Sequence, residues 1–340
     1  MNKEILQRLC NANGISGDED AVRNIIIGEI KNSGAQYNVD NMGNLIVLKK
    51  GRKTPDKKLL ISAHMDEVGF IVTHITSNGY LKFDEVGGID RRVIMGKSVI
   101  VGKNVHGVVT AAPMHLLTAD QRDSIPKIDS MFIDIGADSK EEAMRYVSLG
   151  DSIHFDCDFM WQDDVITGKA LDDRVGCAIM IDMINSELEY DTYFSFVVQE
   201  EVGLRGAKCA AFAVDPDFAI VVETTTAADI PNVSKDKQVC FVGEGAVISF
   251  MDRRTIYDKQ LVDAAMSCAG GNVKTQLKQA VAGGNDAGAI QTSRGGVRTL
   301  AVSLPCRYLH SSCGLISAQD LNSAQYVINT IANKILNNSL

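Results

Sequence analysis

The stretch YFSFVVQEEVGLRGA, Tyr193–Ala207, combines a long apolar run with two adjacent glutamates. The run YFSFVV predicts a buried strand, and GAKCAAFA, which begins at Gly206, predicts a helix. A buried strand that leads within a few residues into a helix is typical of α/β proteins. Glu200 and Glu201 stand at the carboxyl end of this strand, where they either form a solvated turn or hold a ligand.

The strand–helix alternation continues on both sides of this stretch. Helices are predicted at RVGCAIMIDMINSE and SAQDLNSAQYVINTIANKIL, and strands at FAIVVE and VRTLAVSL. Ser317 and Asp320 are predicted to form a capping box at the start of the last helix. The pattern predicts an α/β fold with a mostly parallel central sheet flanked by helices. Residues 67–161 instead alternate short β-like runs with Gly-rich turns, which predicts an inserted small β-barrel or sandwich.

Composition excludes several classes of function. The 340 residues carry a net charge of −9 without a block of Lys or Arg, so the chain is not expected to bind nucleic acid. No apolar run is long enough to span a bilayer, and the N-terminus lacks a signal-peptide core, so no membrane partner is expected. The eight cysteines include no Cys-x-x-Cys pair and several lie in apolar runs. Unpaired thiols are typical of proteins in a reducing compartment, so the chain is predicted to be cytoplasmic.

Polar residues interrupt or follow the apolar strands at five places. They are His64 with Asp66, Asp172 with Asp173, Glu200 with Glu201, Glu223, and His310. Each has a simpler explanation alone; Asp172 and Asp173, for example, could cap the helix that follows them. His, Asp and Glu are the side chains that bind borderline divalent cations. All five places lie at the edge of the sheet where α/β proteins bind ligands. Two histidines and three carboxylates suit two ions, with one glutamate left for proton transfer.

These motifs, in this order, resemble the TET aminopeptidases, the dinuclear metallo-aminopeptidases of metallopeptidase family forty-two. The family includes glutamyl, leucyl and lysyl aminopeptidases and members once labelled endoglucanases. The resemblance covers essentially the whole chain, because VGGIDRRVIMGKSVIV and IDIGADSKEEA are similar to the family's PDZ-like insertion. It implies a catalytic domain of residues 1–66 and 162–340, with residues 67–161 as an inserted β-rich dimerisation domain. It also implies dimers that assemble into a tetrahedral dodecamer.

The resemblance implies a metal ligand at five positions. His64 and Glu223 would bind the first metal, Glu201 and His310 the second, and Asp172 would bridge both. Glu223 departs from the family, which more often has Asp there; a glutamate reaches further, so the backbone must stand back from the metal. Two ions per subunit are expected, either zinc or cobalt, and manganese or nickel would also accept these ligands.

The resemblance also implies two residues that act without binding metal. Glu200 would serve as general base and then general acid, and Asp66 would orient the ring of His64. The peptide bond after Asp172 is often cis in such enzymes. GGNDAG around Asp286 resembles a family Gly-Gly-Thr-Asp segment, to which we assign no role.

The expected reaction is hydrolysis of the N-terminal residue from short peptides by metal-activated water. A carboxypeptidase or deacylase with the same metal pair is an alternative, since Arg174, Arg205 or Arg307 could clamp a substrate carboxylate. A non-catalytic assembly or binding subunit with a degenerate site is a second alternative. The motifs do not encode the preferred N-terminal residue or the native metal.

Overall fold

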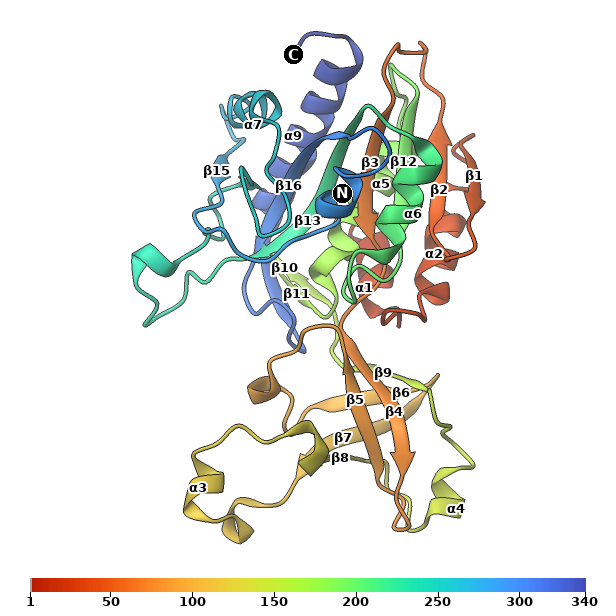
Figure 1. Cartoon of the computed structure of the whole chain (residues 1–340), viewed down its shortest axis with the longest axis vertical. Helices are drawn as coiled ribbons and strands as arrows, with labels where there is room; N and C mark the ends of the chain where they lie inside the picture. The colour runs from red at the N-terminus through yellow and green to blue at the C-terminus, as the bar shows by residue number, and fades with distance from the viewer. Residues whose placement is uncertain (1) are drawn as a thin grey trace.

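A computed structural model describes residues 2–340 as an α/β portion joined to a separate barrel (Figure 1). The α/β portion contains an eight-stranded sheet in the order β1-β2-β12-β3-β13-β16-β14-β15. Its four central strands run parallel to one another: β12 (Thr192–Val197), β3 (Leu59–His64), β13 (Phe218–Thr226) and β16 (Arg298–Cys306). The outer strands are β1 (Gln36–Val39), β2 (Leu45–Lys49), β14 (Ala246–Ile248) and β15 (Thr275–Leu277). The prediction of a mostly parallel central sheet is confirmed.

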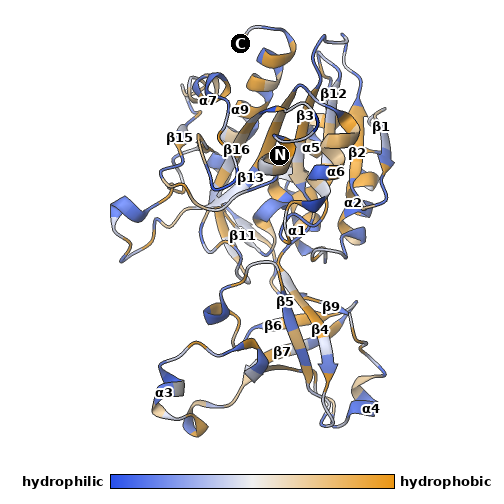
Figure 2. Ribbon diagram, viewed as in Figure 1, coloured by the Kyte–Doolittle hydropathy of each residue, from blue (hydrophilic) through white to orange (hydrophobic). Residues whose placement is uncertain are grey.

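The central strands are buried because helices cover both faces of the sheet. Figure 1 shows α6 in front of the sheet and α5 and α9 behind it. Figure 2 shows that these strands are mainly hydrophobic, as strands covered on two sides must be. The helices of this portion are α1 (Lys3–Asn11), α2 (Asp20–Ile30), α5 (Leu171–Asn185), α6 (Arg205–Val214), α7 (Lys259–Met266), α8 (Ala287–Ile290), α9 (Ala318–Leu336) and the 3-10 helix Lys235–Lys237. Among residues 2–340, no helix has the length and hydropathy needed to cross a membrane.

The inserted portion is a closed six-stranded barrel with a core of its own. Its strand order is β4-β5-β8-β7-β6-β9, and every neighbouring pair is antiparallel. Phe70 packs edge-to-face against Phe83 and Phe155 at its centre. The strands are β4 (Gly69–Ile75), β5 (Leu81–Val86), β6 (Ser98–Val101), β7 (Val105–Ala111), β8 (Met131–Asp134) and β9 (Ser152–Phe155). Short helices lie at Arg91–Val93, Met114–Leu116, Ala119–Arg122 (α3), Ile128–Ser130 and Lys140–Ala143 (α4).

A second, three-stranded sheet begins where the chain leaves the barrel. Its order is β10-β11-β17, formed by Met160–Gln162, Val165–Gly168 and Gly314–Ser317. Ser317 ends β17 and caps α9, because its hydroxyl accepts hydrogen bonds from the N–H groups of Gln319 and Asp320.

The predicted capping box forms only in part: Ser317 caps α9, but the predicted return contact from Asp320 to Ser317 is wrong. The Asp320 carboxylate does not return to Ser317 but accepts hydrogen bonds from the N–H groups of Gly243 and Gly245, at 2.7 and 2.6 Å. Burial raises the pKa of Asp320 to about 6. A tertiary contact that orders a distant loop has therefore replaced the local one.

A buried ionic network joins the barrel to the α/β portion. Glu67, between β3 and β4, receives Nζ of Lys169 at 2.7 Å and a guanidinium nitrogen of Arg174 at 3.1 Å. All three side chains are almost completely buried. Arg174 also donates to the carbonyl oxygen of Met65. His154 of β9 is buried beside the network, and within residues 2–340 neither ring nitrogen has a hydrogen-bond partner. The junction is thus held by charges that water does not screen.

Candidate metal centre

The central sheet brings the predicted residues to one edge. His64 is the last residue of β3, and Glu200 and Glu201 follow the neighbouring strand β12 after Val197, which lies opposite His64. Glu223 lies within β13, on the other side of β3. His310 lies in the loop between β16 and β17. Parallel strands explain this convergence, because their carboxyl ends share one edge of the sheet.

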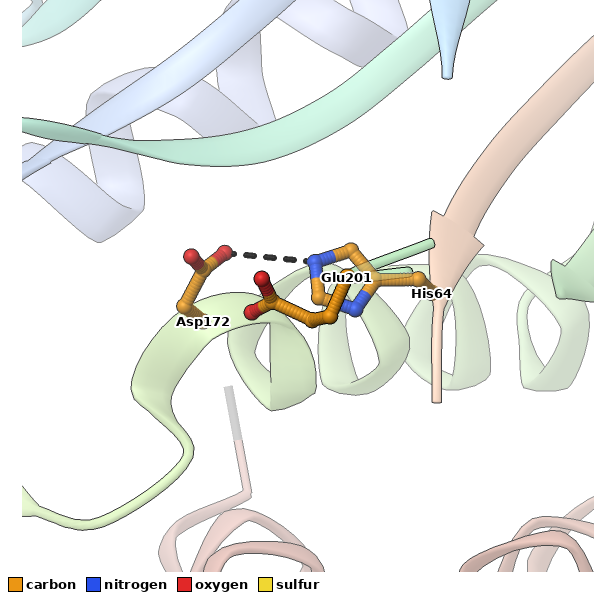
Figure 3. A group of neighbouring side chains, drawn as sticks. All are labelled: His64, Asp172 and Glu201. Carbon is orange, nitrogen blue, oxygen red and sulfur yellow. Dashed lines mark hydrogen bonds and ion pairs between the residues drawn. The ribbon is translucent and has the colours of Figure 1, made fainter. Parts of the chain in front are cut away.

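Asp172, at the start of α5, stands between the two histidines. Its Oδ1 lies 3.3 Å from Nε2 of His64, and its Oδ2 lies 3.2 Å from Nε2 of His310. Glu201 Oε2 is 3.3 Å from the same nitrogen of His310. Figure 3 shows the carboxylates of Asp172 and Glu201 beside the ring of His64, with the contact from Asp172 to the ring drawn as a dashed line. One carboxylate therefore faces two imidazoles through separate oxygens.

Two overlapping groups of donor atoms are close enough to hold a cation. One comprises His64, Asp172 and Glu201, and the other comprises His64, Asp173 and Glu223; within each group the donor atoms lie within 4.8 Å of one another. Glu223 Oε2 is 3.9 Å from Nε2 of His64, and its Oε1 is buried without a hydrogen-bond partner in the described chain. Burial raises the pKa of Glu223 well above its ordinary value. Buried carboxylates that lack partners, beside imidazole nitrogens, fit divalent cations, which would offset the cost of burial.

Asp66 fixes both the histidine and the glutamate turn. His64 Nδ1 lies 3.0 Å from the backbone oxygen of Asp66, and 3.6 Å from its carboxylate. That carboxylate accepts hydrogen bonds from the N–H groups of Glu200 and Glu201, at 3.0 and 3.1 Å, and from the Ser16 hydroxyl at 2.6 Å. Burial acts to raise the pKa of Asp66, but His64 and these donors hold it below its ordinary value. The ring contact is thus made mainly by the backbone, while the carboxylate holds the Glu200–Glu201 turn.

Helix capping applies to Asp173 and not to Asp172, although Asp173 also belongs to the second group of donor atoms. Asp172 turns to the histidines, whereas Asp173 Oδ1 accepts the N–H of Gly176 at 3.1 Å inside α5. The peptide bond between the two aspartates is cis, as the resemblance implied. The sequence alone could not divide the pair in this way, because the division depends on the backbone path into α5.

Glu200 faces an open cavity beside the donor groups. The cavity has a volume of about 510 Å³, and His64, Asp172, Glu201, Glu223 and His310 line it with Glu200. In the part of the chain that the structure describes, the Glu200 carboxylate has no hydrogen-bond partner. Burial raises its pKa well above the ordinary value; His64 opposes this shift, and Asp286 and Glu201 add to it. A carboxylate with these properties is suited to accept a proton from a molecule in the cavity.

Three neighbours of the centre were not predicted. Asp286 is completely buried, neither of its oxygens has a partner within residues 2–340, and burial raises its pKa to about 7. The GGNDAG motif was the only signal for it. Gly87 and Gly88 belong to the connection after β5 of the barrel, and a Cβ at Gly87 would lie 3.3 Å from Cβ of Glu201. One at Gly88 would lie 3.9 Å from Nδ1 of His310, so the barrel borders the centre.

Residues 43–327 match the M42 glutamyl aminopeptidase family. The chain belongs to this family. A curated relative, the putative aminopeptidase of Acetivibrio thermocellus, is 39% identical over 324 residues, which cover 94% of this chain and 95% of the relative. The crystal structure of a TET aminopeptidase from Thaumarchaeota archaeon SCGC AB-539-E09 superposes with a TM-score of 0.91 at 36% identity, over 96% of this chain and 95% of that chain.

A second similar solved structure is described by its assembly. The Pyrococcus horikoshii TET1 peptidase, described as assembling into a tetrahedron or a large octahedral shell, is 37% identical with a TM-score of 0.83, over 97% of this chain and 98% of that chain. The chain is therefore an M42 aminopeptidase, a peptide hydrolase, and its candidate metal groups agree with a metallopeptidase family.

Proposed function

We propose that this M42 aminopeptidase removes the N-terminal residue of short peptides with two divalent ions and with Glu200 as general base. The observation that carries the proposal is Asp172, whose two oxygens lie 3.3 and 3.2 Å from the Nε2 atoms of His64 and His310. A carboxylate that faces two imidazoles through separate oxygens is suited to bridge two ions. His64 and Glu223 would complete one ion's ligands, and Glu201 and His310 the other's.

The side chains around the ligands have separate tasks in this proposal. A pair of divalent ions, when bound, lowers the pKa of a coordinated water to about 7 and polarises a carbonyl group. Glu200 accepts the proton of the attacking water and delivers it to the leaving amine. Asp66 keeps Glu200 in place through the hydrogen bond from the backbone N–H at 3.0 Å. The acidic groups that surround the cavity favour a substrate with a free, positively charged α-amine.

The resemblance of the inserted domain supports a role in assembly. We propose that residues 67–161 form the dimerisation domain and that dimers build a tetrahedral dodecamer. Exposed apolar side chains on the barrel support this, among them Met114, Leu116 and Ile125, which are 71%, 69% and 55% exposed. Apolar side chains that gather on a protein surface mark interaction sites.

The carboxypeptidase alternative loses two of its three candidate clamps. Arg174 is completely buried and bonded to Glu67 and to backbone carbonyls. Arg307 is paired with Asp229 at 2.7 Å. Arg254 and Lys278 do line the cavity, however, so the test must include substrates that carry a free carboxylate.

The decisive experiment compares two substrate classes on metal-stripped protein after zinc, cobalt, manganese or nickel is added. We expect hydrolysis of aminoacyl-p-nitroanilides in the presence of a metal, two equivalents of bound metal per chain, and no hydrolysis of N-acyl amino acids. Turnover of the N-acyl amino acids alone would support a deacylase or carboxypeptidase. A chain that binds no metal and hydrolyses neither class would be an assembly subunit.

A further inference from the structure

The cavity beside the candidate metal centre is lined by cations as well as by acids. Arg254 and Lys278 line it together with Glu200 and Glu201. The sheet order separates the two charges, because the glutamates follow β12, whereas Arg254 comes after β14 and Lys278 after β15, beyond β3, β13 and β16. Neither cation has a role in the proposed hydrolysis. A cavity with charges of both signs is complementary to a ligand that carries both.

Lys278 is a buried cation without a counter-ion. The residue is only 9% exposed, and its Nζ donates a hydrogen bond to the carbonyl oxygen of Ala282 at 3.0 Å. Within residues 2–340 it forms no ion pair. An ammonium group has further N–H donors beyond the one that Ala282 accepts. Because a buried charge is costly unless it is paired, an anion bound in the cavity would stabilise Lys278.

The carboxylates whose charges act on Lys278 are engaged elsewhere. Burial lowers the pKa of Lys278, and Asp252 and Glu223 oppose that shift. Asp252, however, accepts the hydroxyl of Tyr257 at 2.6 Å and the N–H of Arg254 at 2.8 Å. Glu223 belongs to the donor group around His64. The lysine therefore offers its charge to a ligand rather than to the protein.

Arg254 is held over the same loop by close packing. A Cβ at Gly284 would lie 2.9 Å from Cγ of Arg254, and one at Gly288 would lie 2.7 Å from its Cβ. The two glycines thus leave the space that the stem of the arginine occupies. Arg254 is exposed, and within the described chain its guanidinium has no hydrogen-bond partner. Since Lys278 binds Ala282 of this loop, both cations border it.

We propose that Lys278 and Arg254 form a subsite for a carboxylate of the substrate. This rests on the proposed function, which supplies a peptide with a free α-amine. Such a peptide offers a carboxylate either on the side chain of an acidic N-terminal residue or at the C-terminus of a dipeptide. In both cases the amine faces the acidic groups and the carboxylate faces the cations. A guanidinium can bind a carboxylate through two parallel hydrogen bonds, and an ammonium adds a point charge.

Four dipeptides distinguish the two sources of the carboxylate on the full-length, metal-loaded protein. Alanyl-alanine and its amide differ only in the terminal carboxylate. Glutamyl-alanine amide and glutaminyl-alanine amide differ only in the side-chain carboxylate. We expect kcat/KM to be about 10–100-fold higher for the carboxylate member of at least one pair, which is the contribution of hydrogen bonds to a charged group. The pair that shows the difference identifies the source.

Replacing either cation by methionine should abolish that difference while keeping the length of the side chain. The variants are Lys278→Met and Arg254→Met, and the ratio within each peptide pair is measured on the same variant, so a general loss of activity does not affect it. Arg254 is exposed, so Arg254→Met is expected to fold even if Lys278→Met does not. Arg253→Met and Lys274→Met are matched controls at exposed residues that do not line the cavity, and they should preserve the difference.

Two results would overturn the proposal. One is an equal kcat/KM within both peptide pairs. The other is a preference for the carboxylate that survives in both Lys278→Met and Arg254→Met, because other groups would then bind it. If no dipeptide is hydrolysed, the proposed function fails and calorimetric titration with the same peptides decides the subsite. Tighter binding of the carboxylate member would support the subsite, and equal binding would remove it.

Discussion

Replacing Glu200 by Gln tests the proposed chemistry with the smallest change of shape. The substitution exchanges one carboxylate oxygen for an amide group. In the wild-type protein the backbone N–H of Glu200 donates to Asp66 at 3.0 Å, and the substitution should preserve this hydrogen bond. The Glu200 carboxylate forms no hydrogen bond within residues 2–340 that the change would break. We therefore expect the fold and the metal ligands to be preserved, while the group proposed to accept the proton of water is lost.

The size of the effect follows from the tasks assigned to Glu200. General acid–base catalysis contributes about 10²–10⁴-fold to a rate. At about 1.36 kcal/mol for each factor of ten, this range corresponds to about 2.7–5.4 kcal/mol of transition-state stabilisation. Because Glu200 would take part in both proton transfers, we expect kcat to fall by about 10³–10⁴-fold. KM should change little, because the carboxylate is not proposed to hold the substrate.

Steady-state kinetics with an aminoacyl-p-nitroanilide and metal analysis of the same samples measure the two expected outcomes. Glu201→Gln is the matched control, since it makes the same chemical change one residue away, at a side chain 3.3 Å from His310. The control should lose bound metal, whereas Glu200→Gln should retain it. If Glu200→Gln keeps its metal and more than a tenth of the wild-type kcat, Glu200 is not the general base. If it loses metal, Glu200 is a ligand.

Three further predictions concern stability and assembly. Burial and the charge of Lys169 lower the pKa of His154 from 6.5 to about 4, so the unfolded chain binds a proton that the folded chain does not. The stability linked to His154 is complete above pH 6.5 and is lost as the pH falls toward 4, by about 3 kcal/mol. In His154→Leu the melting temperature relative to wild type should thus rise as the pH falls through this window; a pH-independent difference would contradict the assignment. Ser317→Ala removes the cap of α9 and should cost about 1 kcal/mol in thermal unfolding, and an unchanged melting temperature would show that the cap contributes nothing. Leu116→Glu places a charge among the exposed apolar side chains of the barrel and should reduce the particle mass measured by light scattering, whereas an intact particle would place the dimer contact elsewhere.

The sequence predicted the parts of the fold that repeat a regular pattern. The apolar runs that became β3, β12, β13 and β16 are long enough to be recognised as buried strands. Parallel order then required their carboxyl ends to lie together, which is why His64, Glu201 and His310 could be placed at one edge. The outer strands β14 and β15 have three residues each and no recognisable pattern, so they were not predicted.

Side-chain partners across the fold could not be predicted from local pattern. Asp320 stands where a capping box would place it, yet its carboxylate binds Gly243 and Gly245, more than seventy residues earlier in the chain. Asp66 was expected to contact the ring of His64, and its hydrogen bonds to the N–H groups of Glu200 and Glu201 depend on the pairing of β3 with β12. Such contacts arise from tertiary packing, which sequence periodicity does not encode.

The glycines that follow β5 have a consequence for how this enzyme could be re-engineered. Gly87, with φ of +83°, lies against Glu201, and Gly88 lies near His310, so the insertion supplies part of the rim of the reaction chamber. Excising the insertion to obtain a minimal single-domain hydrolase would expose the candidate metal groups on that side to solvent. If the barrel makes the proposed dimer contact, a change of its shape on assembly would reach the rim directly, and subunit contacts and substrate choice are then expected to evolve together.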